Sequence, residues 1–235
     1  MAKLKKVMVI GDLHVPYHHK DAFAFLEALK KHYKGFDLVV NIGDEIDQHG
    51  LSFHDSDPDL PSAGDELKLT KAYIKDLEKI FPKMKLVDSN HSSLIFRRAL
   101  KHGLPKAYLK SYNDFLEVGK GWEWLNDLTV TLSDGQRVFF THGISANILR
   151  VAQQYGMNVC QGHFHSKASI QYYSNPEKLV WAMQTGCLTN QKSLAFGYAK
   201  NFKDRFVMSS GVIIDGQPRI HPMVVQNGKW IGKIV

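Results

Sequence analysis

The sequence predicts an α/β fold, and three observations lead to this prediction. In the first half of the chain, short apolar segments typical of buried strands alternate with longer segments in which apolar residues recur at helical spacing. The second half is mostly a series of short β segments separated by turns. The chain has 235 residues, 44% of them hydrophobic, which is enough to bury one full core. We therefore expect a single domain over residues 1–235, with parallel strands at its centre.

The start of the chain is expected to hold strand-loop-helix units. Residues 4–10 are typical of a buried strand, and a helix is predicted between Ala22 and Tyr33. Residues 37–42 form a second apolar strand. A polar motif directly follows each of these strands. Both motifs therefore lie at carboxyl ends of strands, where loops converge and ligands collect in open α/β sheets.

The middle of the chain is predicted to be mainly helical. Its loop at 48–62 is expected to reach the substrate. In order, the expected elements are the loop at 48–62, a helix with apolar positions between 67 and 80, a strand at 85–88 that delivers Asn90-His91, a helix over 94–100 and further helical pieces to about residue 116.

The pattern changes to β structure near residue 128. Asp134-Gly135 is a hairpin signal, and it predicts that strands 128–132 and 137–141 pair around this turn. The remaining expected elements are a helix over 145–154 and strands at 158–161, 168–173, 178–184, 206–214 and 219–225.

Five short segments concentrate oxygen and imidazole ligands. A carboxylate that can bridge, an amide oxygen and four histidines form a mixed environment of the kind that dinuclear hydrolytic sites use to activate water and hold a phosphoryl group. The segments are Asp12-Leu13-His14, Gly43-Asp44-Glu45-Ile46-Asp47, Asn90-His91, Thr141-His142-Gly143 and Gly162-His163-Phe164-His165.

In order and pattern, these segments resemble the motifs of the calcineurin-like metallophosphoesterases over residues 11–165. Two positions depart from the family pattern, because Ser89 replaces the usual glycine before Asn-His and Ser92 replaces the acidic residue after it. The expected ligands and the proton donor are all retained. The resemblance implies a four-layer α/β fold, in which a two-sheet β-sandwich is flanked by helices.

The resemblance also implies two metal ions with one shared ligand, Asp44. It assigns Asp12, His14, Asp44 and His165 to the first ion, and Asp44, Asn90, His142 and His163 to the second. Four imidazoles favour divalent transition metals over magnesium, which prefers oxygen ligands. We expect manganese, with iron, zinc, cobalt and nickel as alternatives.

The reaction implied by the resemblance is hydrolysis of a phosphate ester by metal-bound hydroxide. His91 is the expected general acid, and Asp47 is expected to orient and polarise it. The competing interpretation of Asp47 is a loop cap. Arg97 and Arg98 follow His91 by about two helical turns and are candidates to bind a substrate phosphate. Their competing interpretation is a solvated or carboxylate-paired helix face.

Charge is unevenly distributed along the chain. The net charge is +7, and residues 135–235 hold 11 Lys and Arg against 3 Asp and Glu. This basic half favours a phosphodiesterase or nuclease acting on nucleotides or nucleic acids, and Tyr198, Lys200 and Lys203 are candidate contacts for a polynucleotide. The alternatives are a phosphomonoesterase of nucleotides or small molecules and a non-catalytic scaffold that keeps the fold for protein binding.

Cysteine content and the N-terminal residues indicate a compartment. Only Cys160 and Cys187 are present, so we expect neither a disulfide framework nor a four-cysteine zinc site. The basic start passes directly into a short apolar strand, too short for a signal peptide or a membrane span. We therefore expect a cytoplasmic protein without membrane contact, and its oligomeric state stays open.

Overall fold

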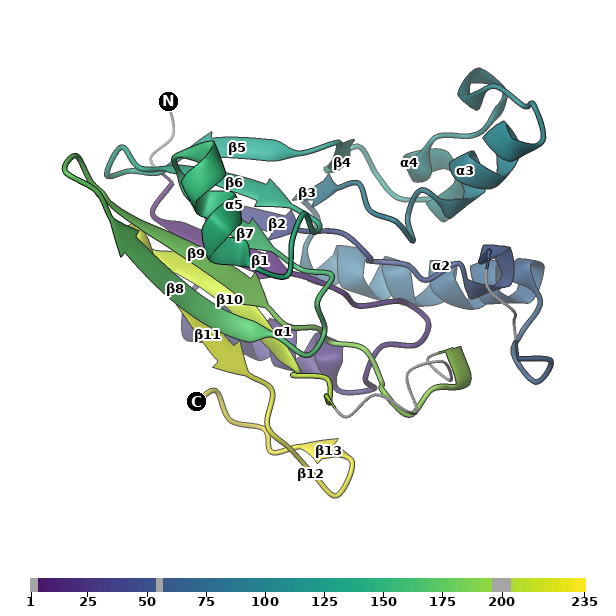
Figure 1. Ribbon diagram of the computed structural model, residues 1–235. Coiled ribbons are helices and arrows are strands. Elements are labelled where there is room, and N and C mark those ends of the chain that lie inside the picture. Colours follow the sequence, from purple (N-terminus) through teal and green to yellow (C-terminus); the bar gives the residue numbers. More distant parts are fainter. Residues whose placement is uncertain (1–3, 54–56, 196–203) are drawn as a thin grey trace.

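The computed structural model describes residues 4–53, 57–195 and 204–235, which form two β-sheets packed face to face (Figure 1). The first sheet has the strand order β11-β10-β1-β2-β3-β4. Its parallel strands are β1 (Lys6–Ile10), β2 (Leu38–Asn41), β3 (Met84–Val87) and β4 (Trp122–Leu125), and it continues through antiparallel β10 (Ser209–Ile214) and β11 (Gln217–Pro222).

The second sheet has the order β5-β6-β7-β9-β8, with antiparallel strands at both edges. Its strands are β5 (Leu128–Thr131), β6 (Arg137–Thr141), β7 (Asn158–Gln161), β9 (Leu179–Thr185) and β8 (Ala168–Ser174). The central strands β6, β7 and β9 are parallel. A small separate hairpin joins β12 (Val225–Gln226) and β13 (Lys229–Trp230).

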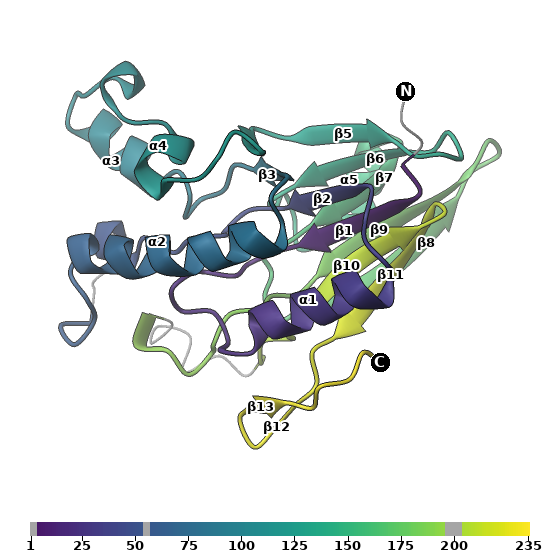
Figure 2. The same cartoon turned by 180° about the vertical axis from the view of Figure 1, so that it is seen from behind.

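Helices cover the outer faces of both sheets (Figures 1 and 2). The helical elements are α1 (Ala22–His32), η1 (His49–Leu51), α2 (Ala63–Ile80), α3 (Leu94–Lys101), η2 (Lys106–Tyr108), α4 (Tyr112–Leu116) and α5 (Ile148–Tyr155). Helices α1 and α2 lie against the first sheet, α5 lies against the second, and α3, η2 and α4 project beyond the end of β3. Among the described residues, no helix combines the length and apolar character needed to cross a bilayer.

Alternation along β1 explains how the layers are held together. Val7 and Val9 point into a core between the two sheets, whereas Met8 and Ile10 point into a second core under α1 and α2. All four side chains are fully buried. A third core joins α5 to the second sheet through residues such as Phe139 and Val151. The four-layer α/β sandwich flanked by helices, which the resemblance implied, is thereby confirmed.

Local sequence signals located most of the elements. The hairpin around Asp134-Gly135 is confirmed, with Leu128 opposite Phe140 and Thr131 opposite Arg137. The helix predicted over 145–154 begins three residues later, because the Asn147 side chain caps it by accepting from the main-chain N–H of Arg150. The strand predicted over 206–214 begins only at Ser209.

Strand β4 was not predicted from the sequence. It has only four residues, and its partner in the sheet is the parallel strand β3, which ends 35 positions before Trp122 in the sequence. The indole of Trp122 is buried, and its Nε1–H donates to the Phe81 carbonyl over 2.8 Å. Tertiary packing of this ring therefore fixes the edge of the sheet, and no local pattern reports it.

We expect Trp122→Ala to lower the free energy of unfolding by about 3–5 kcal/mol, because it empties a buried ring site and leaves the Phe81 carbonyl without its donor. Trp122→Phe keeps most of the packing and should cost about 1–3 kcal/mol. Denaturant unfolding in EDTA measures both values. Leu179→Ala, at a position where the side chain is exposed, is the control and should stay within about 0.5 kcal/mol of the parent protein. Equal losses for Trp122→Ala and the control would contradict the anchoring role.

Candidate metal centre

Loops from both sheets converge at the carboxyl ends of parallel strands. The loops after β1, β2, β3, β6 and β7 carry the five motifs. Main-chain bonds tie the first two loops together, since the N–H groups of Asp12 and His14 donate to the carbonyls of Gly43 and Asp44. The His163 N–H donates to the Asp12 carboxylate and attaches the loop after β7. Segments 151 residues apart thus form one site.

The first group of candidate ligands is Asp12, His14, Asp44 and His165, whose ligand atoms lie within 4.8 Å of one another. His14 Nε2 lies 3.1 Å from His165 Nε2 and 3.4 Å from Asp44 Oδ2. His165 Nε2 lies 3.2 Å from Asp12 Oδ1. The structure thus brings together the set that the resemblance assigned to one ion.

The second group shares Asp44 with the first and adds His142 and His163. His142 Nε2 lies 3.2 Å from Asp44 Oδ2, 3.1 Å from His163 Nδ1 and 2.8 Å from the Asn90 amide oxygen. The Asn90 amide oxygen therefore lies beside this group. Asn90 and His163 are exposed whereas Asp44 is buried, so the second group is the side of the centre that faces solvent.

The spacing and donor chemistry fit divalent metal ions. Two ligand atoms that are each about 2.1 Å from one ion, at tetrahedral or octahedral angles, are separated by about 3.0–3.4 Å. Most of the distances between candidate ligand atoms given in the two preceding paragraphs fall in this range. His14 Nδ1 contacts Asp47 Oδ2 at 2.8 Å, and His142 Nδ1 donates to the Ile42 carbonyl at 3.0 Å. This arrangement leaves Nε2 of both rings to act as the ligand atom, as is usual for metal-binding histidines.

Four of the candidate ligands have left-handed backbone conformations. The φ angles are +52° for Asp12, His14 and Asp44, and +68° for His163. Such values are uncommon outside glycine and cost free energy, so surrounding bonds must hold them in place. The main-chain bonds between the loops supply that support. Backbone strain of this kind concentrates at functional sites.

Glycines beside the ligands allow the loops to approach closely. A Cβ at Gly43 would lie 2.6 Å from His142 Nδ1, and a Cβ at Gly162 would collide with Asp12 Oδ2. Gly43 also has a φ of +101°, which a side chain would disfavour. These positions explain why the motifs pair a glycine with a ligand.

Asp47 and His91 are adjacent, through both the main chain and the carboxylate of Asp47. His91 Nδ1 contacts the main-chain carbonyl of Asp47 at 2.7 Å, whereas the Asp47 carboxylate is bound to His14 through Oδ2. The other carboxylate oxygen, Oδ1, is 3.7 Å from His91 Nδ1 and is buried without a hydrogen-bond partner among the described residues. The main-chain oxygen of Asp47 thus makes the hydrogen bond to His91, the carboxylate lies within ion-pair distance of the same nitrogen, and the orienting role of Asp47 stays a prediction.

A buried polar network that the sequence did not predict lies behind the ligands. Ser89 Oγ accepts from the Asp44 main-chain N–H at 2.9 Å and is 2.8 Å from Ser92 Oγ. Ser92 in turn donates to the Glu45 carboxylate, which also accepts from Trp124 Nε1. The two serines that depart from the family pattern thus connect the loop carrying Asn90 to the loop carrying Asp44. Their neutral hydroxyls give no motif by which they could have been recognised.

The two arginines have different environments. Arg97 is exposed, and its Nη1 donates to the Asn90 carbonyl at 2.9 Å, which places it beside the centre. Arg98 donates instead to the carbonyls of Leu51 and Ser52, so it fixes the loop around η1. These two bonds attach the Arg98 guanidinium to the loop, and its binding of a substrate phosphate stays a prediction.

Gln48 is a further residue whose role was not predicted. Its Nε2 donates to the carbonyls of His91 and Ser92, both at 2.8 Å. It thereby holds the loop that presents the expected general acid. The candidate polynucleotide contacts Tyr198, Lys200 and Lys203 lie outside the described residues.

The electrostatics of the centre favour bound positive charge. Burial alone would raise the pKa of Asp44, but the imidazoles around it outweigh burial and hold its pKa well below the usual value. Burial lowers the pKa of His142, but Asp44 reverses this and raises it to about 9. Burial raises the pKa of Glu45 to about 7 and that of Asp47 to about 6. Without a metal ion, a proton on His142 therefore supplies the positive charge that Asp44 attracts.

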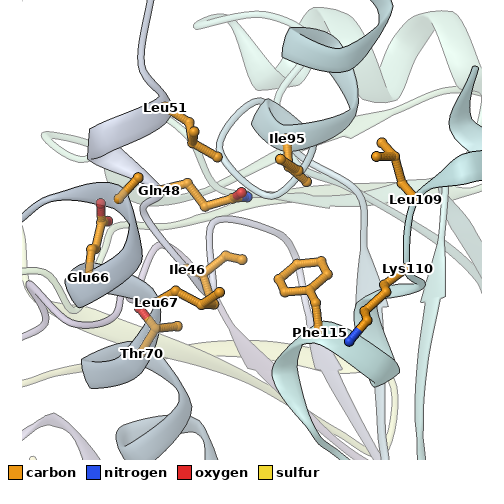
Figure 3. A pocket seen from close by; sticks show the side chains of 11 residues that line it. Ile46, Gln48, Leu51, Glu66, Leu67, Thr70, Ile95, Leu109, Lys110 and Phe115 are labelled. Atoms are coloured by element: carbon orange, nitrogen blue, oxygen red, sulfur yellow. The ribbon is translucent and has the colours of Figure 1, made fainter. Parts of the chain in front are cut away.

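A cavity of about 210 Å³ lies next to the centre, between α2 and the segment that carries α3 and α4 (Figure 3). None of the candidate ligands lines it. Ile46 and Gln48 line the cavity from the motif loop. The other apolar lining residues are Leu51, Ala63, Leu67, Ile95, Leu109 and Phe115, and the polar ones are Glu66, Thr70 and Lys110. The cavity therefore lies behind the motif loop and is separate from the candidate metal centre.

Comparison with known proteins gives one family match and several similar solved structures. The family model described as calcineurin-like phosphoesterase matches residues 5–183. No curated protein matches the sequence. Similar solved structures include Vps29 from Chaetomium thermophilum, with 14% identity, a TM-score of 0.48 and coverage of 94% of this chain and 92% of that one. The same protein in complex with the cyclic peptide RT-D3 has 15% identity and a TM-score of 0.49, with coverage of 99% of this chain and 94% of that one. A metallophosphoesterase from Sphaerobacter thermophilus has 11% identity and a TM-score of 0.44, with coverage of 95% of this chain and 90% of that one.

We expect Gly162→Ala to weaken manganese binding at least tenfold, because the added methyl group collides with the Asp12 carboxylate. Isothermal titration and the manganese-dependent rise in melting temperature measure the loss. Gly64→Ala is the matched control, since a Cβ there would have its nearest neighbour, Ser62 Oγ, 4.0 Å away. Unchanged manganese affinity in Gly162→Ala would show that Asp12 does not contribute to metal binding.

We expect Glu45→Gln to stabilise the metal-free protein increasingly as pH rises from 5 to 8. The folded-state pKa of Glu45 is raised from its ordinary 4.5 to about 7, so the folded state favours the protonated acid. The stability associated with this proton is present below pH 4.5 and is lost as pH rises through about 7. Glutamine avoids the loss, which is on the order of 3 kcal/mol at pH 8. Thermal unfolding in EDTA, with exposed Glu27→Gln as the control, should show a gap in melting temperature that widens with pH; a constant gap contradicts the assignment.

Proposed function

The chain belongs to the calcineurin-like phosphoesterase family, and we propose that it is a metal-dependent phosphodiesterase or nuclease acting on nucleotides or nucleic acids. The observation that carries this proposal is the pair of ligand groups sharing Asp44, with an imidazole that is not part of either group beside them. A phosphomonoesterase would use the same groups, so the ester type is decided by experiment.

Two divalent cations are the proposed cofactors, with manganese as the first candidate. Asp12, His14, Asp44 and His165 would hold one, and Asp44, Asn90, His142 and His163 would hold the other. When bound, such cations activate water for attack and stabilise the charge that develops on the phosphoryl oxygens. The mixed nitrogen and oxygen donors are compatible with manganese, iron, zinc, cobalt or nickel.

His91 is the proposed general acid for the leaving oxygen. Its Nδ1 faces a carbonyl, which only accepts hydrogen bonds, so Nδ1 carries a proton and Nε2 is the atom that can transfer one. The ring packs edge-on to His14, with centroids 4.6 Å apart, and the side chain is partly exposed. It is therefore near the reacting groups and accessible to substrate.

Asp47 and Arg97 are proposed to position the reacting groups. The Asp47 carboxylate holds His14 through Nδ1, which fixes the ring orientation and directs Nε2 at the metal position. Arg97 is exposed next to Asn90 and retains further N–H donors that can bind a phosphoryl oxygen. Arg98 supports the loop around η1 through two of its nitrogens, and its other N–H groups are further candidates for a phosphoryl oxygen.

The test is hydrolysis of a chromogenic phosphodiester and a chromogenic monoester with added manganese. We expect turnover of the diester, and we expect His91→Ala to lower kcat by about 10²–10⁴ while manganese content is unchanged. The loss should be smaller for a nitrophenyl ester than for an alkyl ester, because a good leaving group needs less protonation. Asp44→Asn should reduce metal binding itself.

His32→Ala, at an exposed histidine on α1, is the control for the loss of an imidazole and should retain full activity. Turnover of the monoester alone would replace the proposed reaction with a phosphomonoesterase reaction. Bound manganese without hydrolysis of either ester would contradict the enzymatic proposal and favour the scaffold.

A further inference from the structure

One segment outside the candidate metal centre has an unusual charge distribution. Residues 94–110, which we name the basic arm, include α3 and η2. They contain five Lys and Arg and neither Asp nor Glu: Arg97, Arg98, Lys101, Lys106 and Lys110. Within the described residues, Lys101, Lys106 and Lys110 form no ion pair with a carboxylate. A concentration of positive charge without local compensation attracts polyanions.

The basic arm extends away from the layered core. It projects past the end of β3 in both views (Figures 1 and 2), and every residue from 100 to 108 is exposed. Protein packing therefore covers little of this stretch. Its shape suits contact with a long ligand that passes over the outside of the protein.

Large apolar side chains accompany the charges. Tyr108 is 81% exposed, Leu100 is 62% exposed and Leu104 is 50% exposed. Next to the arm, the ring of Phe53 lies 4.2 Å from the Arg98 guanidinium and 5.2 Å from the Lys101 ammonium. Single exposed apolar residues are normal on a protein surface, but several that lie together among cations mark an interaction surface.

The arm begins at the candidate metal centre. Arg97 donates to the main-chain carbonyl of Asn90, and the side-chain oxygen of Asn90 is 2.8 Å from His142 Nε2. A ligand lying along the arm would therefore pass from Tyr108 through Lys101 and Arg97 to the solvent-facing group of candidate ligands. A surface that leads into a hydrolytic centre implies that its ligand contains the bond to be cleaved.

We propose that the basic arm binds single-stranded polynucleotide and guides it to the metal centre, an inference that rests on the proposed phosphodiesterase function. Lysine and arginine side chains bind the phosphates, and Tyr108 offers an exposed ring on which a base stacks. Stacking on a protein ring requires a base that is not paired within a duplex, so the surface favours single strands.

The first test is binding of a fluorescently labelled single-stranded DNA 20-mer to the full chain in EDTA, followed by anisotropy over a range of salt concentrations. We expect Lys101→Glu combined with Lys106→Glu to weaken binding at least tenfold and to reduce the salt slope by about 1.4, for two phosphate contacts. Tyr108→Ala should weaken binding about fivefold or more. The same strand in a duplex should bind more weakly than the single strand.

Lys229→Glu combined with Lys233→Glu makes the same change of charge at exposed positions near the C-terminus and should bind normally. Lys106 packs over Phe96, so Lys101→Glu alone replaces the double variant if the latter unfolds. None of the arm variants should change turnover of the small chromogenic diester, since these residues do not contact the candidate ligands.

The two proposals fail in different ways. Hydrolysis of the small diester without binding of the 20-mer would overturn the role of the basic arm and leave the phosphodiesterase standing. Binding that depends on the arm, without manganese-dependent hydrolysis of any ester, would support the role of the basic arm and overturn the proposed enzymatic activity.

Equal binding of single strand and duplex, or no effect of Tyr108→Ala, would overturn the proposed base stacking. Binding to phosphatidylserine vesicles in place of the oligonucleotide would overturn the choice of ligand.

Discussion

Burial of three carboxylates in one small volume is the constraint on which the rest of this structure depends. Asp12, Asp44 and Asp47 are all at most 1% exposed. Buried charge is costly unless it is paired and hydrogen-bonded. Imidazoles, several main-chain N–H groups and the proposed cations meet most of this requirement, with Asp47 Oδ1 as an exception among the described residues, and they come from loops of both sheets. The two sheets must therefore align the carboxyl ends of their parallel strands at one edge, which is the arrangement the fold provides.

The same requirement accounts for the polar residues behind the ligands. Ser89 and Ser92 tie the loop after β3 to the loop after β2, and Glu45 joins them to Trp124 on β4. Each buried polar group here has a partner, which makes such a network rigid and fixes one arrangement of the loops. In this chain, the hydroxyl groups of Ser89 and Ser92 therefore connect the two loops by hydrogen bonds, at the two positions where the family pattern has a glycine and an acid.

Sequence reasoning succeeded where the signal is local and failed where it depends on tertiary distance. The alternation along residues 4–10 and the Asp134-Gly135 turn predict their elements because neighbours in sequence determine them. The candidate ligands are recognisable because each motif lies directly after a strand. Strand β4 is different, since only pairing with β3 and burial of Trp122 define it. The partners of Asp47 and Arg98 likewise depend on which atoms meet in space, and residue type cannot report that.

The distribution of the candidate ligands along the chain has a consequence for how the protein is made. Residues 12–91 supply one part of the set, and residues 142–165 supply the other, with His165 meeting His14 across 151 positions. Contacts of such long range form late, because a long loop must first be closed. During synthesis, β1 to β3 emerge well before β7, so the growing chain carries its acidic loops exposed and incomplete. The proposed metal site is therefore complete only after the second sheet has docked.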